Sequence, residues 1–425
     1  MILLVLLSFL FCLLIEIPVA FAMGLSSLFY ILVNGKITIG IILQKMVGGT
    51  DSFALMAVPF FILAGELMNE SGITERLVKL SSSLVGHIRG GLAHTVVVAE
   101  MFLSGITGSA IADASALGTV LIPAMKKKGY DAAFSAVVSG SAATLGPIIP
   151  PSITMVIIGV ATETSIGKLF MGGILPGICL GFALMGLIYF ISRKRGYPRD
   201  RRATFREIMK ALKESAIPLI MPLIIIGGIL GGAFTPTEAG AVAAAFAFVV
   251  GLFVFKEIKV SNLPTLLYNT TITTAKVMFI IGAAALFGWV LTFEQVPKLV
   301  SEAIFSITSN KYLILLIINI FYLILGCLME TVAAIFLTAP ILMPMVTSLG
   351  VDPVHFGLIM TVNLMIGTLT PPVAVVMYVV NSIADISVAE FAKEFIPFFI
   401  VLLTFLLLIT YFPPLVMVLP NLFFK

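Results

Sequence analysis

The chain has 425 residues, of which 60% are hydrophobic and 11% are charged, and its formal net charge is +4. Its mean hydropathy is +1.17. Soluble domains carry about 45–50% apolar and about 25% charged residues, and much of any folded surface must face water. The composition therefore excludes an ordinary soluble protein and predicts a polytopic membrane protein with several spans of about 20 residues each.

Taken in chain order, the apolar runs predict ten full spans, at 2–15, 18–34, 53–70, 131–163, 169–191, 216–233, 236–255, 276–293, 353–383 and 395–418. The first run has no preceding Lys or Arg and no small-residue cleavage site, so we expect a span rather than a cleaved leader. Two further apolar segments, 92–125 and 312–346, are interrupted near their middles by small or polar residues. They predict re-entrant helical hairpins.

Four other segments mix charged and apolar residues at helical spacing: 73–88, 200–214, 262–275 and 295–309. This pattern is typical of amphipathic helices that lie in the membrane interface. Ordinary loops on either side of the membrane are the alternative. The three cysteines (Cys12, Cys179 and Cys327) all lie in apolar runs, which excludes a disulfide framework and a clustered zinc site.

An internal repeat organises the chain, because a series of Gly, Asp and Pro residues recurs 221 residues later. The first set is Pro123, Gly129, Asp131, Gly146, Pro150 and Pro176, and the second is Pro344, Gly350, Asp352, Gly367, Pro371 and Pro397. Residues 1–195 and 216–425 are therefore predicted to be two repeats, joined by a linker and interfacial helix at 196–215.

The basic residues predict how the repeats lie in the membrane. Lys126, Lys127 and Lys128 occupy a loop whose equivalent in the second repeat, 347–349, carries no charge. Positive residues favour the cytoplasmic side, so equivalent loops are expected on opposite faces, with the linker cytoplasmic. We therefore predict an all-α membrane fold built from an inverted repeat, with two re-entrant hairpins and two Pro-broken helices.

Polar residues interrupt the apolar pattern at four places: the hairpin tips 104–113 and 326–331, and the breaks 139–152 and 363–372. Proline lacks an N–H and frees a carbonyl one turn earlier, and unwound backbone in a membrane must line protein or a watery cavity. Free carbonyls and hydroxyls suit a small cation. The candidate cation ligands are Ser104, Gly105, Gly146, Pro150, Gly326, Glu330, Gly367, Thr368 and Thr370.

Helix N-termini at the tips and after the proline pairs would direct positive ends at an anion between them. The alternative is that small residues only allow tight helix packing. Two acids stand beside the tips. Asp113 is expected either to bind substrate or cation or to make a buried structural hydrogen bond, and Glu330 either to bind or to cap a helix.

The segment Gly108–Asp113 and the break Gly367–Pro372 resemble the large membrane subunit of the tripartite ATP-independent periplasmic (TRAP) transporters. The resemblance extends over essentially the whole chain. It implies elevator-type, sodium-coupled uptake of an organic anion across the inner membrane, such as a C4-dicarboxylate or sialic acid. It also implies two partners: a small four-helix membrane subunit on a separate chain and a periplasmic substrate-binding protein.

The resemblance places Ser109 and Asp113 at the substrate site, and Thr144, Pro147 and Asn363 in the adjoining breaks complete the candidate set. It assigns the two cation cages to sodium, with no organic cofactor. Two other classes stay open. An intramembrane enzyme would need a nucleophile with a base or a metal triad, and the chain has no HExxH or GxSxG motif. A passive channel would need a continuous polar lining, whereas the polar residues here form separate clusters.

Overall fold

The structure, a computed structural model, describes residues 1–424, which form helices and no β-strand. Eight helical segments are long and apolar enough to cross a membrane: Phe53–Glu70, Ile166–Arg195, Phe205–Leu230, Pro236–Val254, Val260–Phe293, Lys311–Leu328, Thr331–Ser348 and Val388–Tyr411. The predicted all-α, multi-span fold is therefore confirmed. Other apolar helices have 10–17 residues, fewer than a full span normally needs.

The first half contains ten α-helices. They are α1 (Ile2–Leu14), α2 (Val19–Asn34), α3 (Gly40–Thr50), α4 (Ala57–Glu70, after the 3-10 turn Phe53–Met56), α5 (Ile73–Val85), α6 (Gly91–Thr107), α7 (Ala110–Lys127), α8 (Ala132–Ala143), α9 (Ile153–Thr162) and α10 (Ile166–Arg195). Helix α3 was not predicted, because its 11 residues are too few for a span and include Gln44 and Lys45.

The second half contains another ten. They are α11 (Phe205–Leu230), α12 (Pro236–Val249, continued by the π-helical turn Val250–Val254), α13 (Leu263–Phe293, after the 3-10 turn Val260–Asn262), α14 (Val296–Ile307), α15 (Lys311–Leu328), α16 (Thr331–Ser348), α17 (Pro353–Gly367), α18 (Val375–Ala384), α19 (Val388–Tyr411) and α20 (Pro414–Phe423).

Each of the four interrupted segments forms a pair of helices. The predicted hairpins are α6–α7 and α15–α16, and the Pro-broken spans are α8–α9 and α17–α18. Helix α16 begins and ends 221 residues after α7, so the sequence repeat recurs in the helix boundaries. The inverted orientation of the two halves and the re-entrance of the hairpins stay predictions.

Three predicted boundaries are wrong. The interfacial helix 200–214 and the span 216–233 are one helix, α11, in which Pro218 and Pro222 lie without ending it. Residues 262–275 and 276–293 are likewise one helix, α13. A change from charged to apolar residues shows where a helix passes from the interface into the membrane. It does not end the helix, because no capping or helix-breaking residue is needed there. The predicted span 395–418 divides into α19 and α20 at Phe412 and Pro413, since proline favours a helix start.

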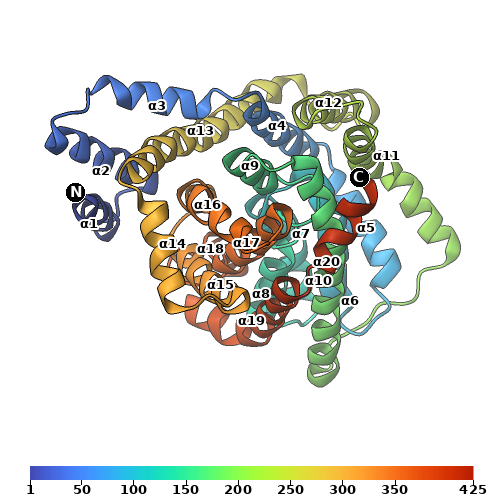
Figure 1. Cartoon of the computed structure of the whole chain (residues 1–425). Coiled ribbons are helices and arrows are strands. Elements are labelled where there is room, and N and C mark those ends of the chain that lie inside the picture. Colours follow the sequence, from blue (N-terminus) through green and yellow to red (C-terminus); the bar gives the residue numbers. More distant parts are fainter. Residues whose placement is uncertain (425) are drawn as a thin grey trace.

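Figure 1 shows how the halves combine. Helices α7–α9 and α16–α18 lie in the middle of the molecule, so the interrupted segments of both halves meet there. Helices α1–α3 lie at one outer edge and α11 and α12 toward another, and the long α13 crosses over the top of the view. The centre is therefore built from the segments in which the polar breaks occur.

The loop 196–200, between the two halves, is bonded to the first half. Gly90 donates its backbone N–H to the carbonyl of Pro198 at 3.1 Å, and Asp200 donates its N–H to the carbonyl of Gly86 at 2.9 Å. The loop and the connection between α5 and α6 are therefore joined by backbone bonds in both directions.

Side chains reinforce this attachment. Tyr197 donates its hydroxyl to Asp131 at 2.5 Å, and Arg195 forms ion pairs with Asp131 at 3.1 Å and with Glu394 at 2.8 Å. Burial, followed by the bond to Asp131, raises the pKa of the Tyr197 phenol, so it stays a protonated donor at neutral pH. Residues 201–204 have no comparable anchor, since Arg201 pairs with Glu207 of the helix that follows.

Candidate functional site

Each hairpin tip contacts the break of its own half, as the sequence predicts. In the first half Gly108 adopts a φ of 62°, and a Cβ there would lie 2.5 Å from the carbonyl oxygen of Pro151. In the second half a Cβ on Gly367 would lie 2.4 Å from the carbonyl carbon of Gly326. Val373 also donates its N–H to the carbonyl of Cys327 at 3.0 Å. Glycine is required at these crossings because the backbones leave no room for a side chain.

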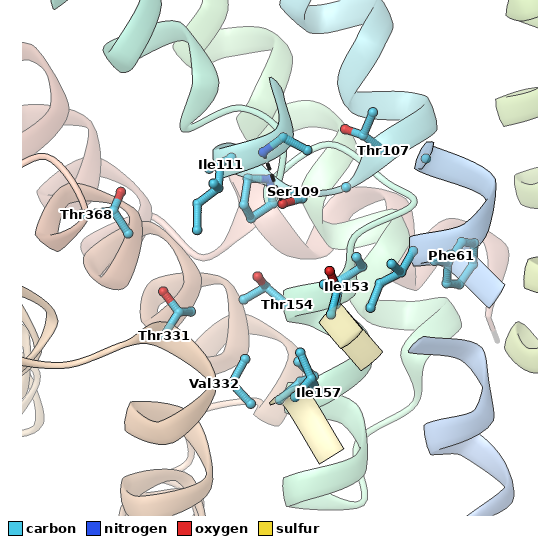
Figure 2. Close-up of a pocket in the computed structure, with 18 of the residues that line it drawn as sticks. Phe61, Thr107, Ser109, Ile111, Ile153, Thr154, Ile157, Thr331, Val332 and Thr368 are labelled. Carbon is cyan, nitrogen blue, oxygen red and sulfur yellow. Dashed lines mark hydrogen bonds between the residues drawn. The ribbon is translucent and has the colours of Figure 1, made fainter. Parts of the chain in front are cut away.

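A cavity of about 230 Å³ lies where the two tips approach each other (Figure 2). Its lining comes from α4 and α13 and from the two tips, α9 and the end of α17. Figure 2 shows Thr331 and Thr368 on one side of this space, Phe61 on the other and Thr154 between them. The lining is mostly apolar, with hydroxyls from Thr107, Ser109, Thr154, Thr273, Thr331 and Thr368. Such a lining is typical of a site for a small molecule.

Three helices present their N-termini to this cavity. The first residues of α7 and α9 line it, and so do Thr331 and Val332 at the start of α16. Ser109 caps α7 by accepting the N–H of Ala112 at 3.5 Å, and Ser152 caps α9 by accepting that of Met155 at 3.2 Å. Unpaired amides and the helix dipole make such termini favourable for an anion.

Helix α16 is different, because its cap is charged. Glu330 accepts the N–H groups of Val332 at 2.8 Å and Ala333 at 3.1 Å through one carboxylate oxygen. The carboxylate therefore already occupies the positive end of α16. Of the two roles left open for Glu330, capping is the one that the structure shows. The neutral caps leave α7 and α9 as the termini that can attract an anion from the cavity.

Asp113 does not line the cavity. Its side chain is fully buried behind the tip, accepts a hydrogen bond from Thr107, and lies against Gly146, where a Cβ would come within 2.4 Å of its Oδ2. It also lies within hydrogen-bonding reach of the buried Glu100, while no backbone N–H, amide or hydroxyl among residues 1–424 donates to its Oδ2. Asp113 therefore faces the first tip–break contact, which is the predicted cation cage, rather than the space beside Ser109.

Several predicted cation ligands of the first half lie around this contact. Ser104 is fully buried and donates its hydroxyl to the carbonyl of Glu100 at 2.7 Å, which leaves its oxygen lone pairs free. Within residues 1–424 no hydrogen bond reaches the carbonyl of Gly146, Ile149 or Pro150. A Cβ on Gly105 would lie 2.9 Å from Pro222 of α11 and 3.7 Å from the Pro150 oxygen, so this position packs tightly between helices.

The second half offers fewer free oxygens. Thr368 donates to the carbonyl of Met365 at 2.7 Å and Thr370 to that of Ile366 at 2.9 Å, and Thr368 also lines the cavity. The carbonyls of Leu369 and Thr370 receive no hydrogen bond within the described chain. The two predicted cages are thus not equivalent: Asp113 faces the first, whereas the acid of the second tip, Glu330, caps α16.

Two predicted substrate residues lie away from the cavity. Thr144 is buried and donates to the carbonyl of Ser141 at 2.7 Å, within its own helix end. Asn363 is fully buried and faces α15, where it donates to Asn319 at 2.9 Å. Ser109 and Pro147 do line the cavity. Thr154, Glu66 and Asn69 also line the cavity but were not predicted to do so. The only signal in the sequence is that Glu66 and Asn69 are polar residues within an apolar run.

Paired helix breaks around a central cavity are typical of membrane transporters. The chain belongs to the family described as "Tripartite ATP-independent periplasmic transporter, DctM component", which it matches over residues 6–415. The predicted family is therefore confirmed, and the family description makes the chain one component of a tripartite system.

Curated relatives agree with this assignment, and a solved structure shares the fold. The sialic acid TRAP transporter large permease protein SiaM of Vibrio cholerae is 40% identical over 96% of this chain and 95% of its own. The C4-dicarboxylate TRAP transporter large permease protein DctM of Pseudomonas aeruginosa is 39% identical over 94% of each chain. The crystal structure of the YdaH transporter of Alcanivorax borkumensis shares the fold, with a TM-score of 0.61 over 87% of each chain at 16% identity.

Proposed function

We propose that the chain is the translocating subunit of a sodium-coupled transporter that imports a small organic anion across the bacterial inner membrane. The substrate class is a carboxylate, such as the sialic acid or C4-dicarboxylates for which two relatives are named. A small four-helix membrane subunit and a periplasmic binding protein would complete the tripartite system. The binding protein would deliver the anion to the cavity beside Ser109.

The observation that carries this proposal is the convergence of α7 and α9 on one cavity. Both helices have neutral serine caps, at Ser109 and Ser152, so their positive ends remain available. Helix termini favour a nearby negative charge by about 0.3–1 kcal/mol, and by up to about 2 kcal/mol where partly buried. The described lining contains no basic side chain and includes the acids Glu66 and Glu330, so these termini are the groups that would attract a carboxylate.

Sodium is proposed because the residues of the first tip–break contact carry oxygen atoms that can bind a cation. The hydroxyl of Ser104, the carbonyls of Gly146 and Pro150, which accept no hydrogen bond within residues 1–424, and the carboxylate of Asp113 are hard ligands that suit a small hard cation. A bound cation would also offset the charge of a fully buried carboxylate. Ion binding at this contact would join the tip to the break, and the same tip carries Ser109. Sodium would thereby order the anion site.

Movement of an elevator type is proposed from the two groups of helices that line the cavity. The tips and breaks come from α6–α9 and α15–α18, and the remaining lining comes from α4 and α13. The first group would carry the substrate past the second, so that the cavity opens alternately to each side of the membrane. In this account α1–α5 and α11–α14 form the scaffold, and the interrupted segments with the helices that follow them, α10 and α19, form the moving part.

Uptake into proteoliposomes tests the proposal. The chain is reconstituted with its small subunit and binding protein, and radiolabelled succinate and sialic acid are supplied under an inward sodium gradient or an equal potassium gradient. We expect saturable uptake of one of them with sodium only. Thr368→Val and Ser104→Ala should raise the sodium concentration for half-maximal uptake. Thr404→Val is the matched control. It removes an exposed hydroxyl on α19 that donates to the carbonyl of Ile400, one helical turn earlier. Flux that does not saturate and ignores sodium would instead identify a channel.

A further inference from the structure

The second half contains a chain of buried hydrogen bonds that the proposed transport mechanism does not use. Asn363 of α17 donates to Asn319 of α15 at 2.9 Å, and Asn319 donates to Thr410 of α19 at 3.0 Å. Thr410 donates in turn to the carbonyl of Leu406 at 2.7 Å. The chain therefore has one direction and crosses three helices.

All three side chains are removed from solvent. Asn319 and Thr410 are 1% exposed and Asn363 is 0% exposed. The same Asn363 amide also donates to the carbonyl of Ile359 at 2.9 Å, which fixes the orientation of its two terminal atoms. Polar residues within membrane segments are expensive to keep and usually have a specific partner or role. Here the donating groups all have partners, whereas the Oδ1 of Asn363 has none among residues 1–424, and the role follows from the positions.

The hydrogen-bonded residues stand close to the second tip–break contact. Asn363 precedes Gly367 by one helical turn on α17, and Asn319 precedes Gly326 by two turns on α15. Gly326 and Gly367 are the residues whose backbones touch. A slide of α15 along α17 would separate these glycines, and the Asn319–Asn363 bond opposes that slide.

The first half lacks this arrangement. The residues that stand 221 positions earlier are Val98, Ala142 and Tyr189, which cannot form an amide–amide bond. Instead, the first half has Asp113 buried at its tip–break contact. The two halves therefore fix their tips by different means.

We propose that Asn319, Asn363 and Thr410 are positioning residues that hold the register of α15 against α17 and α19. They keep the second tip, from Gly326 to Glu330, in place against its break, whereas at the first tip this part would fall to an ion bound at Asp113. This inference rests on the proposed function, and it assigns Asn363 to positioning rather than to substrate contact. The second cage is preformed and the first is assembled by its ligand.

The test is a double substitution, Asn319→Leu with Asn363→Leu. A single substitution leaves a buried amide without its partner and should destabilise the protein by about 1–3 kcal/mol. The double variant removes both amides, so its thermal stability should return toward that of the parent. The double variant nevertheless lacks the Asn319–Asn363 hydrogen bond that is proposed to hold α15 in register with α17. Asn381→Leu is the matched control, because Asn381 is a buried amide on α18 in the same half whose side chain has no partner among residues 1–424.

Hydrogen exchange of the purified protein distinguishes a positioning role from a general contribution to stability. A positioning role predicts faster exchange at the second tip and break alone. In the double variant, peptides covering 326–331 and 367–374 should exchange about tenfold faster, the effect of losing one or two net hydrogen bonds. Peptides covering 105–110 and 146–152 should match the parent. Unchanged exchange at the second tip would overturn the proposal.

Sodium binding separates this proposal from the proposed function. Thermal melts in sodium chloride or choline chloride report whether the parent binds sodium at all. If it does, the double variant should need several-fold more sodium for the same stabilisation, and an unchanged requirement would contradict a role in positioning a cage. If the parent is not stabilised by sodium, the coupling proposal fails, and the exchange measurement still decides whether these residues hold the register.

Discussion

Gly326 and Gly367 touch backbone to backbone, so that a Cβ on Gly367 would lie 2.6 Å from the Cα of Gly326. No side-chain movement can relieve this contact, because only main-chain atoms are involved. Gly367→Ala should therefore destabilise the protein by about 1–3 kcal/mol, as overpacking does, and displace the second tip.

A thermal melt checks this prediction. Gly288→Ala in α13 is the control, since a Cβ there meets nothing within 4 Å and alanine favours helix over glycine. Equal melting temperatures for Gly367→Ala and the parent would show that the two backbones separate without loss of stability.

A second prediction concerns Asp113. Asp113→Asn keeps the volume and still accepts the hydrogen bond from Thr107, but it removes a buried charge. We expect a protein that melts as high as the parent, or higher, and no longer transports. Uptake and a thermal melt on the same preparation measure both effects. Glu302→Gln, an exposed acid paired with Lys298, is the control for loss of one charge. Normal uptake by Asp113→Asn would leave the hydroxyls and carbonyls as the only binding groups.

A third prediction uses the cap of α7. Ser109→Asp retains a good N-cap, because aspartate and serine cap helices about equally well. It also places a carboxylate at the terminus where the substrate carboxylate would bind. The variant should fold normally yet lose most of its affinity for the anion. Ser165→Asp, at the exposed cap of α10, makes the same chemical change away from the cavity. Undiminished anion uptake by Ser109→Asp would move the substrate site away from α7.

A fourth prediction concerns the side of the membrane on which each half's loops lie. Lys127 and Ser348 hold equivalent positions at the ends of α7 and α16, and both are exposed. In a background without the native cysteines, Ser348→Cys should react with an impermeant thiol reagent added outside the cell. Lys127→Cys should react only after the cells are opened. The reverse pattern, or equal labelling, would exclude the inverted repeat.

The repeat was readable from sequence because Gly and Pro determine where helices stop. Pro150, Pro151, Pro371 and Pro372 mark the breaks, and the helices around them begin and end near the predicted residues. The continuity of α11 and α13 was not readable, because the boundary between interface and membrane leaves the backbone unchanged. Helix α3 carries no start or stop signal strong enough to identify it.

The side chains that face the cavity were harder to predict. Every residue of α17 from Val354 to Gly367 is buried. The sequence of this helix therefore has no exposed polar face from which to tell that the side carrying Asn363 packs against α15. Sequence spacing placed Asn363 near the second break, and only the packing of three helices shows that it points elsewhere. Ser109 was placed at the site by the family resemblance, and the structure shows it capping α7, at the helix end that lines the cavity.

The backbone bonds that attach loop 196–200 to the start of α6 make the linker part of the first half. A gene divided between the codons for Arg202 and Ala203 would leave that loop on the N-terminal product and the Thr204 capping box on the C-terminal one. Two separately synthesised polypeptides should then find each other in the membrane, whereas division at Gly196 would place the loop on the wrong product. Co-purification of the two products from cells making both would show that the linker's covalent continuity is dispensable for assembly.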